Sequence, residues 1–164
     1  MDYFVIKDVK DFLHKNLILS KRLTNNDAKR LNLTNTYLED EEENFLPKQW
    51  FCSLAIAQWE DVEIFVQGDN DKPCTKFIDL AERIFDQLHQ HVSSAFMYLK
   101  NFFPALEVDD FYLSTITFGK IINFDDRFFT GFSIAFYSEY PKEYQYKVKF
   151  KEDGWPIGFE GGPF

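Results

Sequence analysis

The stretch from Cys74 to Phe103 carries apolar side chains at helical spacing, and this feature constrains the fold more than any other. Its apolar positions recur every three or four residues, at Phe77, Leu80, Ala81, Ile84, Leu88, Val92, Ala95, Leu99 and Phe102. This spacing predicts one long helix that buries a broad face. About 30 residues would extend about 45 Å, so we expect a bend near 92–94. Pro73 suits the first helical turn, and Pro104 ends the element.

Segments with the two-residue periodicity of β-strands lie on both sides of this helix. The expected strands cover 17–19, 50–57, 62–66, 111–118, 128–137, 144–151 and 155–159. We expect a turn at 59–61, a strand end at Gly68, and a hairpin turn at Asp153-Gly154. Strands grouped around a helix predict an α+β fold, with a mainly antiparallel sheet packed against one long amphipathic helix.

Residues 24–48 are predicted to form a polar, acidic loop. Asn25-Asn26, 34–36 and the acidic run 39–43 combine turn-forming residues with a block of like charge. The chain has 164 residues, which is near the usual size of one domain. We therefore expect a single α+β domain over residues 1–164, interrupted by this loop.

The net charge of −9 narrows the class of partner. Such a charge repels nucleic acid and attracts cationic molecules, and no basic stripe is visible along the chain. We therefore expect no nucleic-acid binding. The alternative is that the charge serves solubility alone.

A partner-binding surface is predicted around the acidic run. Acidic inhibitors of basic proteins use complementary charge to speed association, and aromatic residues supply anchors in such interfaces. The candidate partner-binding residues are Glu39, Asp40, Glu41, Glu42, Glu43, Phe45, Trp50, Trp59, Asp125 and Asp126. The alternative for 39–43 is a solvated acidic loop.

The cysteines and the amino terminus bear on location. Cys52 and Cys74 have no metal-like spacing, which is typical of free thiols in a reducing compartment. The first eight residues have acidic residues where a signal peptide would have basic ones, and no apolar run is long enough to span a bilayer. These observations predict a cytoplasmic location without membrane contact.

No catalytic constellation is recognisable, and we expect no cofactor and no metal. Glu82, Asp86 and His89 share one helix face and could ligate a metal, but no matching contributor from a second helix is visible. They are therefore interpreted as a solvated face. An enzyme with a dispersed site near Cys74, or near Asp86 and His89, remains an alternative. Gly161-Gly162 is interpreted as part of a frayed tail.

A pattern across residues 48–160 resembles small bacterial α+β proteins of unknown function found among the immunity proteins of polymorphic toxins. The resemblance lies in the strand that Trp50 leads, a second strand ending at 68–69, a helix carrying Ala81 and Leu88, and the segments 146–150 and 153–154. Residues 1–47, which include the acidic run, lie outside it.

This resemblance implies that the chain binds a cognate protein toxin, which we expect to be basic, and neutralises it without catalysis. The immunity protein would cover the active site of the toxin or hold the toxin in an inactive shape. A scaffold or a subunit of another assembly is the competing hypothesis. The sequence does not indicate an oligomeric state.

Overall fold

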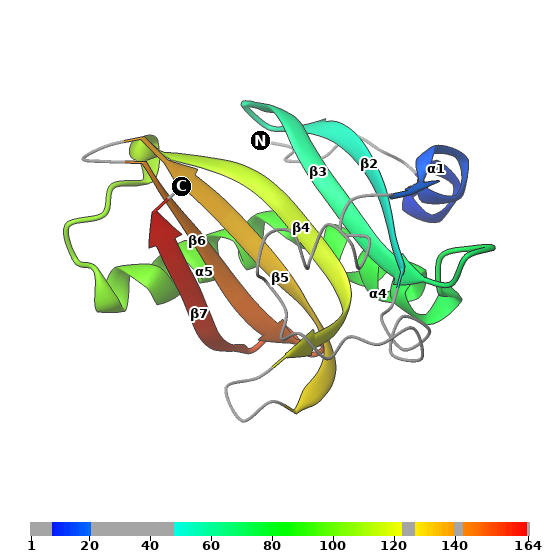
Figure 1. The fold of residues 1–164 in the computed structure, drawn as a ribbon. Helices are drawn as coiled ribbons and strands as arrows, with labels where there is room; N and C mark the ends of the chain where they lie inside the picture. The colour runs from blue at the N-terminus through cyan, green and yellow to red at the C-terminus, as the bar shows by residue number, and fades with distance from the viewer. Residues whose placement is uncertain (1–7, 21–47, 123–126, 140–142, 164) are drawn as a thin grey trace.

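The computed structural model describes residues 8–20, 48–122, 127–139 and 143–163. These residues form a seven-stranded sheet whose helices lie on one face (Figure 1). The elements are α1 (Val9–Asn16), β1 (Ile18–Leu19), β2 (Lys48–Ile56), β3 (Trp59–Gly68), α4 (Thr75–Phe85), α5 (Leu88–Phe102), the 3-10 helix η1 (Val108–Asp110), β4 (Phe111–Ile122), β5 (Phe128–Ser138), β6 (Tyr144–Lys151) and β7 (Pro156–Pro163). The predicted α+β class is confirmed.

The strands lie in the sheet in the order in which they occur in the chain, from β1 to β7. Every neighbouring pair is antiparallel except β3 and β4, which run parallel. Parallel neighbours require a crossover, and α4 and α5 supply it. The expectation of a mainly antiparallel sheet is therefore confirmed.

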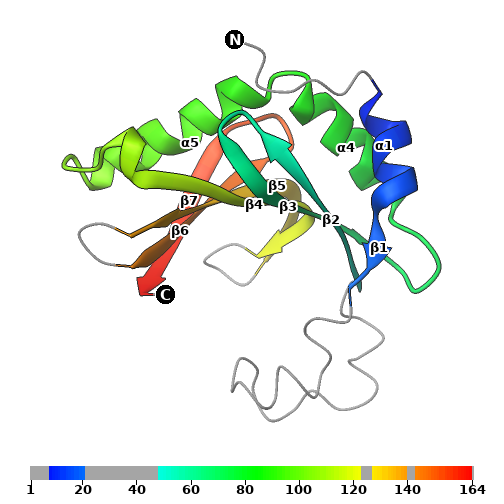
Figure 2. The ribbon, with the colours of Figure 1, turned by 90° about the horizontal axis from the view of Figure 1, so that it is seen from above.

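The predicted single long helix is wrong, because the stretch forms two helices that separate at Asp86 and Gln87. Gln87 leaves the helical conformation with φ −130° and ψ 38°. Figure 2 shows α4 and α5 meeting at an angle over the sheet. A twisted sheet turns away beneath a straight rod, so two shorter helices follow it better. The break lies before the bend expected at 92–94, and neither glycine nor proline marks it in the sequence.

The β2–β3 hairpin turns earlier than the sequence predicts. Ile56 pairs with Trp59, so Ala57 and Gln58 form the turn and residues 59–61 already belong to β3. Ala57 has φ 53°, a left-handed conformation that hairpin turns usually assign to Gly, Asn or Asp. The sequence therefore carries no signal for this turn.

The carboxyl-terminal hairpin forms at the predicted Asp153-Gly154 turn. Gly154 has φ +92°, which glycine adopts without a steric penalty, and its N–H donates to the carbonyl of Lys151. The interpretation of Gly161-Gly162 as a frayed tail is wrong, since both residues lie in β7 and pair with Tyr146 and Gln145 of β6.

The hydrophobic core lies between the sheet and the helices. Phe118, Phe132 and Phe150 are neighbours across β4, β5 and β6, and all three are fully buried. The rings of Phe132 and Phe150 are nearly parallel, with centroids 4.6 Å apart. Alternate residues on these strands face the opposite side of the sheet, which we call the open face because no described helix covers it.

Helix α1 was not predicted. Asp8 caps it by accepting a hydrogen bond from the N–H of Asp11. Its Lys10 ammonium lies 2.5 Å from the carboxylate of Asp79 on α4, and Leu13 is buried in the core. The ion pair is exposed, so the burial of Leu13 matters more for holding α1 in place.

Candidate functional site

Most of the predicted partner-binding residues lie outside the described part of the chain. This applies to Glu39, Asp40, Glu41, Glu42, Glu43, Phe45, Asp125 and Asp126. Their proposed role therefore stays a prediction.

The two predicted tryptophan anchors are described, and both are tied to the fold. Trp59 is 6% exposed, and its indole N–H donates to the carbonyl of Phe111 across 3.3 Å. Trp50 is half-buried, and its indole N–H donates to the carbonyl of Asp69 at 2.9 Å. Trp59 thus has little surface to offer a partner, whereas Trp50 keeps a partly exposed ring.

One end of the sheet gathers carboxylates from segments that are distant in the sequence. The bond from Trp59 to Phe111 fixes the β2–β3 hairpin beside the start of β4, and Phe111 in turn pairs with Ser138 at the end of β5. Figure 1 shows these strand ends along the upper edge of the sheet. The carboxylates at this acidic end belong to Glu60, Asp61, Glu63, Glu107, Asp109, Asp110, Glu139 and Glu143.

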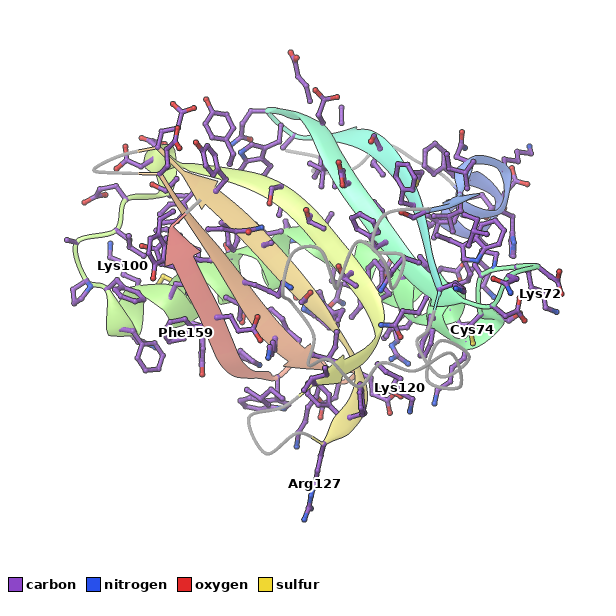
Figure 3. All side chains as sticks on the ribbon, in the orientation of Figure 1. Lys72, Cys74, Lys100, Lys120, Arg127 and Phe159 are labelled. Carbon is purple, nitrogen blue, oxygen red and sulfur yellow. The ribbon has the colours of Figure 1, made fainter. Side chains whose placement is uncertain are left out.

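The opposite end of the same strands carries basic side chains. Lys120 pairs across strands with Thr130, and Lys151 pairs with Gly131. Figure 3 shows Lys120 and Arg127 together at the lower end of β4 and β5. Carboxylates are also present at this end, because Glu152 and Asp153 follow Lys151 in the turn, so its charge is mixed.

A hollow of about 670 Å³ lies on the open face beside the acidic end. Among the residues lining it are Glu60, Asp61, Glu63, Tyr112, Tyr137 and Gln145; we call these six residues the acidic recess. Tyr112 and Tyr137 are direct neighbours across β4 and β5, and Gln145 continues their row on β6. Tyr112 is 55% exposed, so one aromatic ring is largely open to solvent.

Burial and nearby carboxylates both change the pKa of Tyr137 in the recess. Burial raises the pKa of the Tyr137 hydroxyl, and the carboxylates of Glu143 and Glu139 raise it further. A side-chain hydrogen bond between Tyr137 and Glu143 also raises this pKa. The carboxylates of Glu143 and Glu139 therefore place negative charge beside the Tyr137 hydroxyl.

Lys149 places a positive charge on the same face, but this charge is compensated within the chain. Only 6% of its side chain is exposed, and its ammonium forms an ion pair with the carboxylate of Glu160. It also donates to the carbonyl of Ile122 at 2.8 Å. A buried lysine needs such partners, so Lys149 acts as part of the structure of the open face.

A second hollow, of about 520 Å³, lies on the helical side, where the break between α4 and α5 meets the β6–β7 turn. Arg83 donates to the carbonyl of Glu152 at 3.0 Å and so joins α4 to that turn. His91 lies edge-on to Phe132, with ring centroids 5.4 Å apart. Burial lowers the pKa of His91, and the neighbouring His89 lowers it further.

The candidate metal residues do not form a compact site. Glu82 lies in α4, but that helix ends at Phe85, before Asp86 and His89. All three candidates are exposed. Within the described residues, no group of three or more His, Cys, Asp or Glu side chains is placed to hold a metal ion.

The two cysteines have different environments, and neither is in a disulfide. Cys52 is buried among core residues, and burial raises the pKa of its thiol to about 11. Cys74 is half-buried at the position that precedes the first residue of α4. Cys52 therefore packs as a small apolar side chain.

Comparisons of the chain with protein-family models, with curated proteins and with solved structures find no match. The resemblance to immunity proteins therefore stays a prediction. Separately, no helix in the described segments combines the length and the apolar character needed to cross a membrane.

The sequence-based search missed the acidic recess because its residues are spread over β3, β4, β5 and β6. Glu60 and Asp61 were assigned to a turn, and Tyr112 and Tyr137 were counted only as strand formers. One feature of the sequence did indicate a carboxylate on the open face. Glu63 alternates with the apolar residues Val62 and Ile64, which places a carboxylate on the face opposite to the core.

Proposed function

We propose that this chain is a non-enzymatic protein-binding domain that recognises a basic protein, and that the partner is a toxin which it neutralises. The acidic end and its recess are the observation on which the first part rests. The second part rests on the resemblance across residues 48–160. Inhibition would be stoichiometric, by covering the active site of the toxin or by holding the toxin in an inactive shape.

The arrangement of charge supports recognition of a cation. Carboxylates at the acidic end add to one local field, and such fields steer oppositely charged partners and raise the association rate. Glu60 and Asp61 are exposed, while Glu63 is half-buried deeper on the open face. Exposed polar residues such as Glu60 and Asp61 are typical of the rim of a protein interface.

The partner is best sought in the protein encoded by the adjacent open reading frame. Co-expression of this chain should restore growth to cells that produce that protein, and the purified pair should bind with nanomolar affinity. The association rate should fall as salt is raised, because screening weakens the field. If the adjacent protein is not toxic, or does not bind, the proposed function is wrong.

Charge reversal at the acidic end tests where the partner binds. The double variant Glu60→Lys/Asp61→Lys should slow association about tenfold at low salt, because it inverts the field on the rim. The control Asp71→Lys/Asp86→Lys changes the net charge equally, at exposed positions outside the acidic end. Thermal unfolding should confirm that both variants fold.

Equal effects of the two double variants would show that only net charge matters, and would contradict a site at the acidic end. Light scattering tests the competing hypothesis of a scaffold. A stable homo-oligomer that has no affinity for the adjacent protein would favour that hypothesis.

A further inference from the structure

The acidic recess combines an aromatic wall and an acidic wall. On one side, Tyr112 and Tyr137 stand next to each other across β4 and β5. On the other side, β3 contributes Glu60, Asp61 and Glu63. The two sides are held together by the parallel pairing of β3 and β4, in which Glu63 lies opposite Thr115.

The floor between these walls is made of short side chains. Thr115 lies beside Ala135 on β5, and Ser114 also lines the hollow. The hydroxyl of Ser114 donates to the carbonyl of Ala135 at 3.1 Å. Short side chains leave the space between the tyrosines and the carboxylates open. The resulting hollow of about 670 Å³ is large enough for more than one side chain of a partner.

We propose that the recess accepts an arginine side chain of the basic partner, with its guanidinium group between the tyrosine rings and the carboxylates. This inference rests on the proposed function and names the chemical group that the same surface takes.

Arginine fits this combination of walls better than lysine does. The guanidinium group is planar, so it stacks on an aromatic face while its N–H groups bond a carboxylate in a fork. It is also more weakly hydrated than an ammonium group, so a partly sheltered site costs it less. Lysine could use the carboxylates as a point charge but could not stack in the same way.

The test uses the full chain, labelled with 15N, and two tripeptides, acetyl-Gly-Arg-Gly-amide and acetyl-Gly-Lys-Gly-amide. NMR titration should give saturable shifts at the amides of Tyr112, Tyr137 and Gln145 with the arginine peptide. The lysine peptide should bind about two- to fivefold more weakly, because an ammonium group cannot stack on a tyrosine ring and bond a carboxylate in a fork at the same time. Equal affinities would overturn the choice of arginine, and the absence of saturable shifts at these amides would overturn the site.

Two pairs of variants make the assignment specific. Tyr112→Ala should weaken binding of the arginine peptide about two- to fivefold, and Asp61→Asn should also weaken it. The matched controls are Phe128→Ala, an exposed aromatic residue at the opposite end of β5, and Asp71→Asn. Both controls should leave the affinity unchanged, and the inference is wrong if they weaken binding as much as the recess variants do.

The outcomes separate this inference from the proposed function. If the adjacent protein binds and depends on Glu60 and Asp61, but the arginine peptide does not bind the recess, only the inference fails. If the arginine peptide binds the recess and the adjacent protein does not bind, only the proposed function fails.

Discussion

The side-chain amide of Gln67 makes both of its hydrogen bonds to the backbone of Lys120. Its Nε2 donates to the carbonyl of Lys120 at 3.0 Å, and its Oε1 accepts from the N–H of Lys120 at 2.6 Å. The parallel ladder between β3 and β4 has its last pair at Val66 and Phe118. Gln67 is 5% exposed, so its side chain extends the pairing where the two backbones separate.

Replacement of Gln67 by alanine should therefore destabilise the protein. We expect the free energy of unfolding to fall by about 1–2 kcal/mol, because the peptide groups of Lys120 lose their partners. Urea denaturation measures this change. Gln58→Ala, at the exposed β2–β3 turn, is the matched control and should have little effect. A similar loss in both variants would contradict a special role for the Gln67 amide.

Gly119 is expected to depend on the same side chain. It has φ +153°, and a Cβ atom there would overlap the amide of Gln67. Gly119→Ala should destabilise the protein by about 2 kcal/mol or more, through backbone strain and this overlap. In a double-mutant cycle, Gly119→Ala should cost less in the Gln67→Ala background, since the overlap is then gone. Additive costs would show that the two residues do not interact.

The stability of the protein should fall as the pH drops below about 6.5, the ordinary pKa of histidine. Burial lowers the pKa of His91 in the folded state, so the unfolded chain binds more protons over this range, and proton uptake favours unfolding. Thermal unfolding between pH 7.5 and about 5 measures the effect, and the variant His91→Phe should reduce it.

Several charged or titratable groups surround His91, and one of them provides the control variant for this prediction. They are His89, Arg83, Asp86, Glu152 and Asp153. His89→Gln removes the neighbouring imidazole and should leave most of the pH dependence in place, because burial is the larger cause. If His91→Phe keeps the full pH dependence between pH 7.5 and 5, His91 is not its source.

The two thiols should react at different rates in the native protein. The thiolate is the reactive form, and Cys52 is buried with its pKa raised to about 11. We expect Ellman's reagent to modify Cys74 readily and Cys52 only after denaturation. Cys74→Ser should abolish the early reaction, and Cys52→Ala should preserve it. Rapid native modification of Cys52 would contradict its burial.

Local patterns were predicted well where one short segment determines them. The strand at 144–151 and the Asp153-Gly154 turn both formed as expected, because side-chain period and turn conformation are local properties. The break at Gln87 was missed because it depends on the twist of the sheet beneath the helices, and that sheet is made by other segments. The turn at Ala57 was missed because alanine rarely adopts a positive φ.

The acidic recess could not be predicted for a further reason. Its tyrosines and carboxylates meet only because β3 and β4 are neighbours. That adjacency follows from the path of the crossover through α4 and α5, and no local pattern in either strand encodes it. The sequence predicts an acidic partner-binding surface at the run 39–43, which lies outside the described residues.

The parallel ladder between β3 and β4 divides the sheet into two halves, β1 to β3 and β4 to β7. Apart from β1 and β2, neighbouring strands within each half follow one another closely in the chain, whereas Glu63 and Thr115 meet only after a long intervening segment has closed into a loop. We expect such contacts to form late in folding, because the entropy cost of closing the loop comes before the contact stabilises the chain. The carboxylates of the recess belong to one half and its tyrosines to the other. In an incompletely folded chain these carboxylates and tyrosines are therefore separated, and the recess exists only once β3 and β4 have paired.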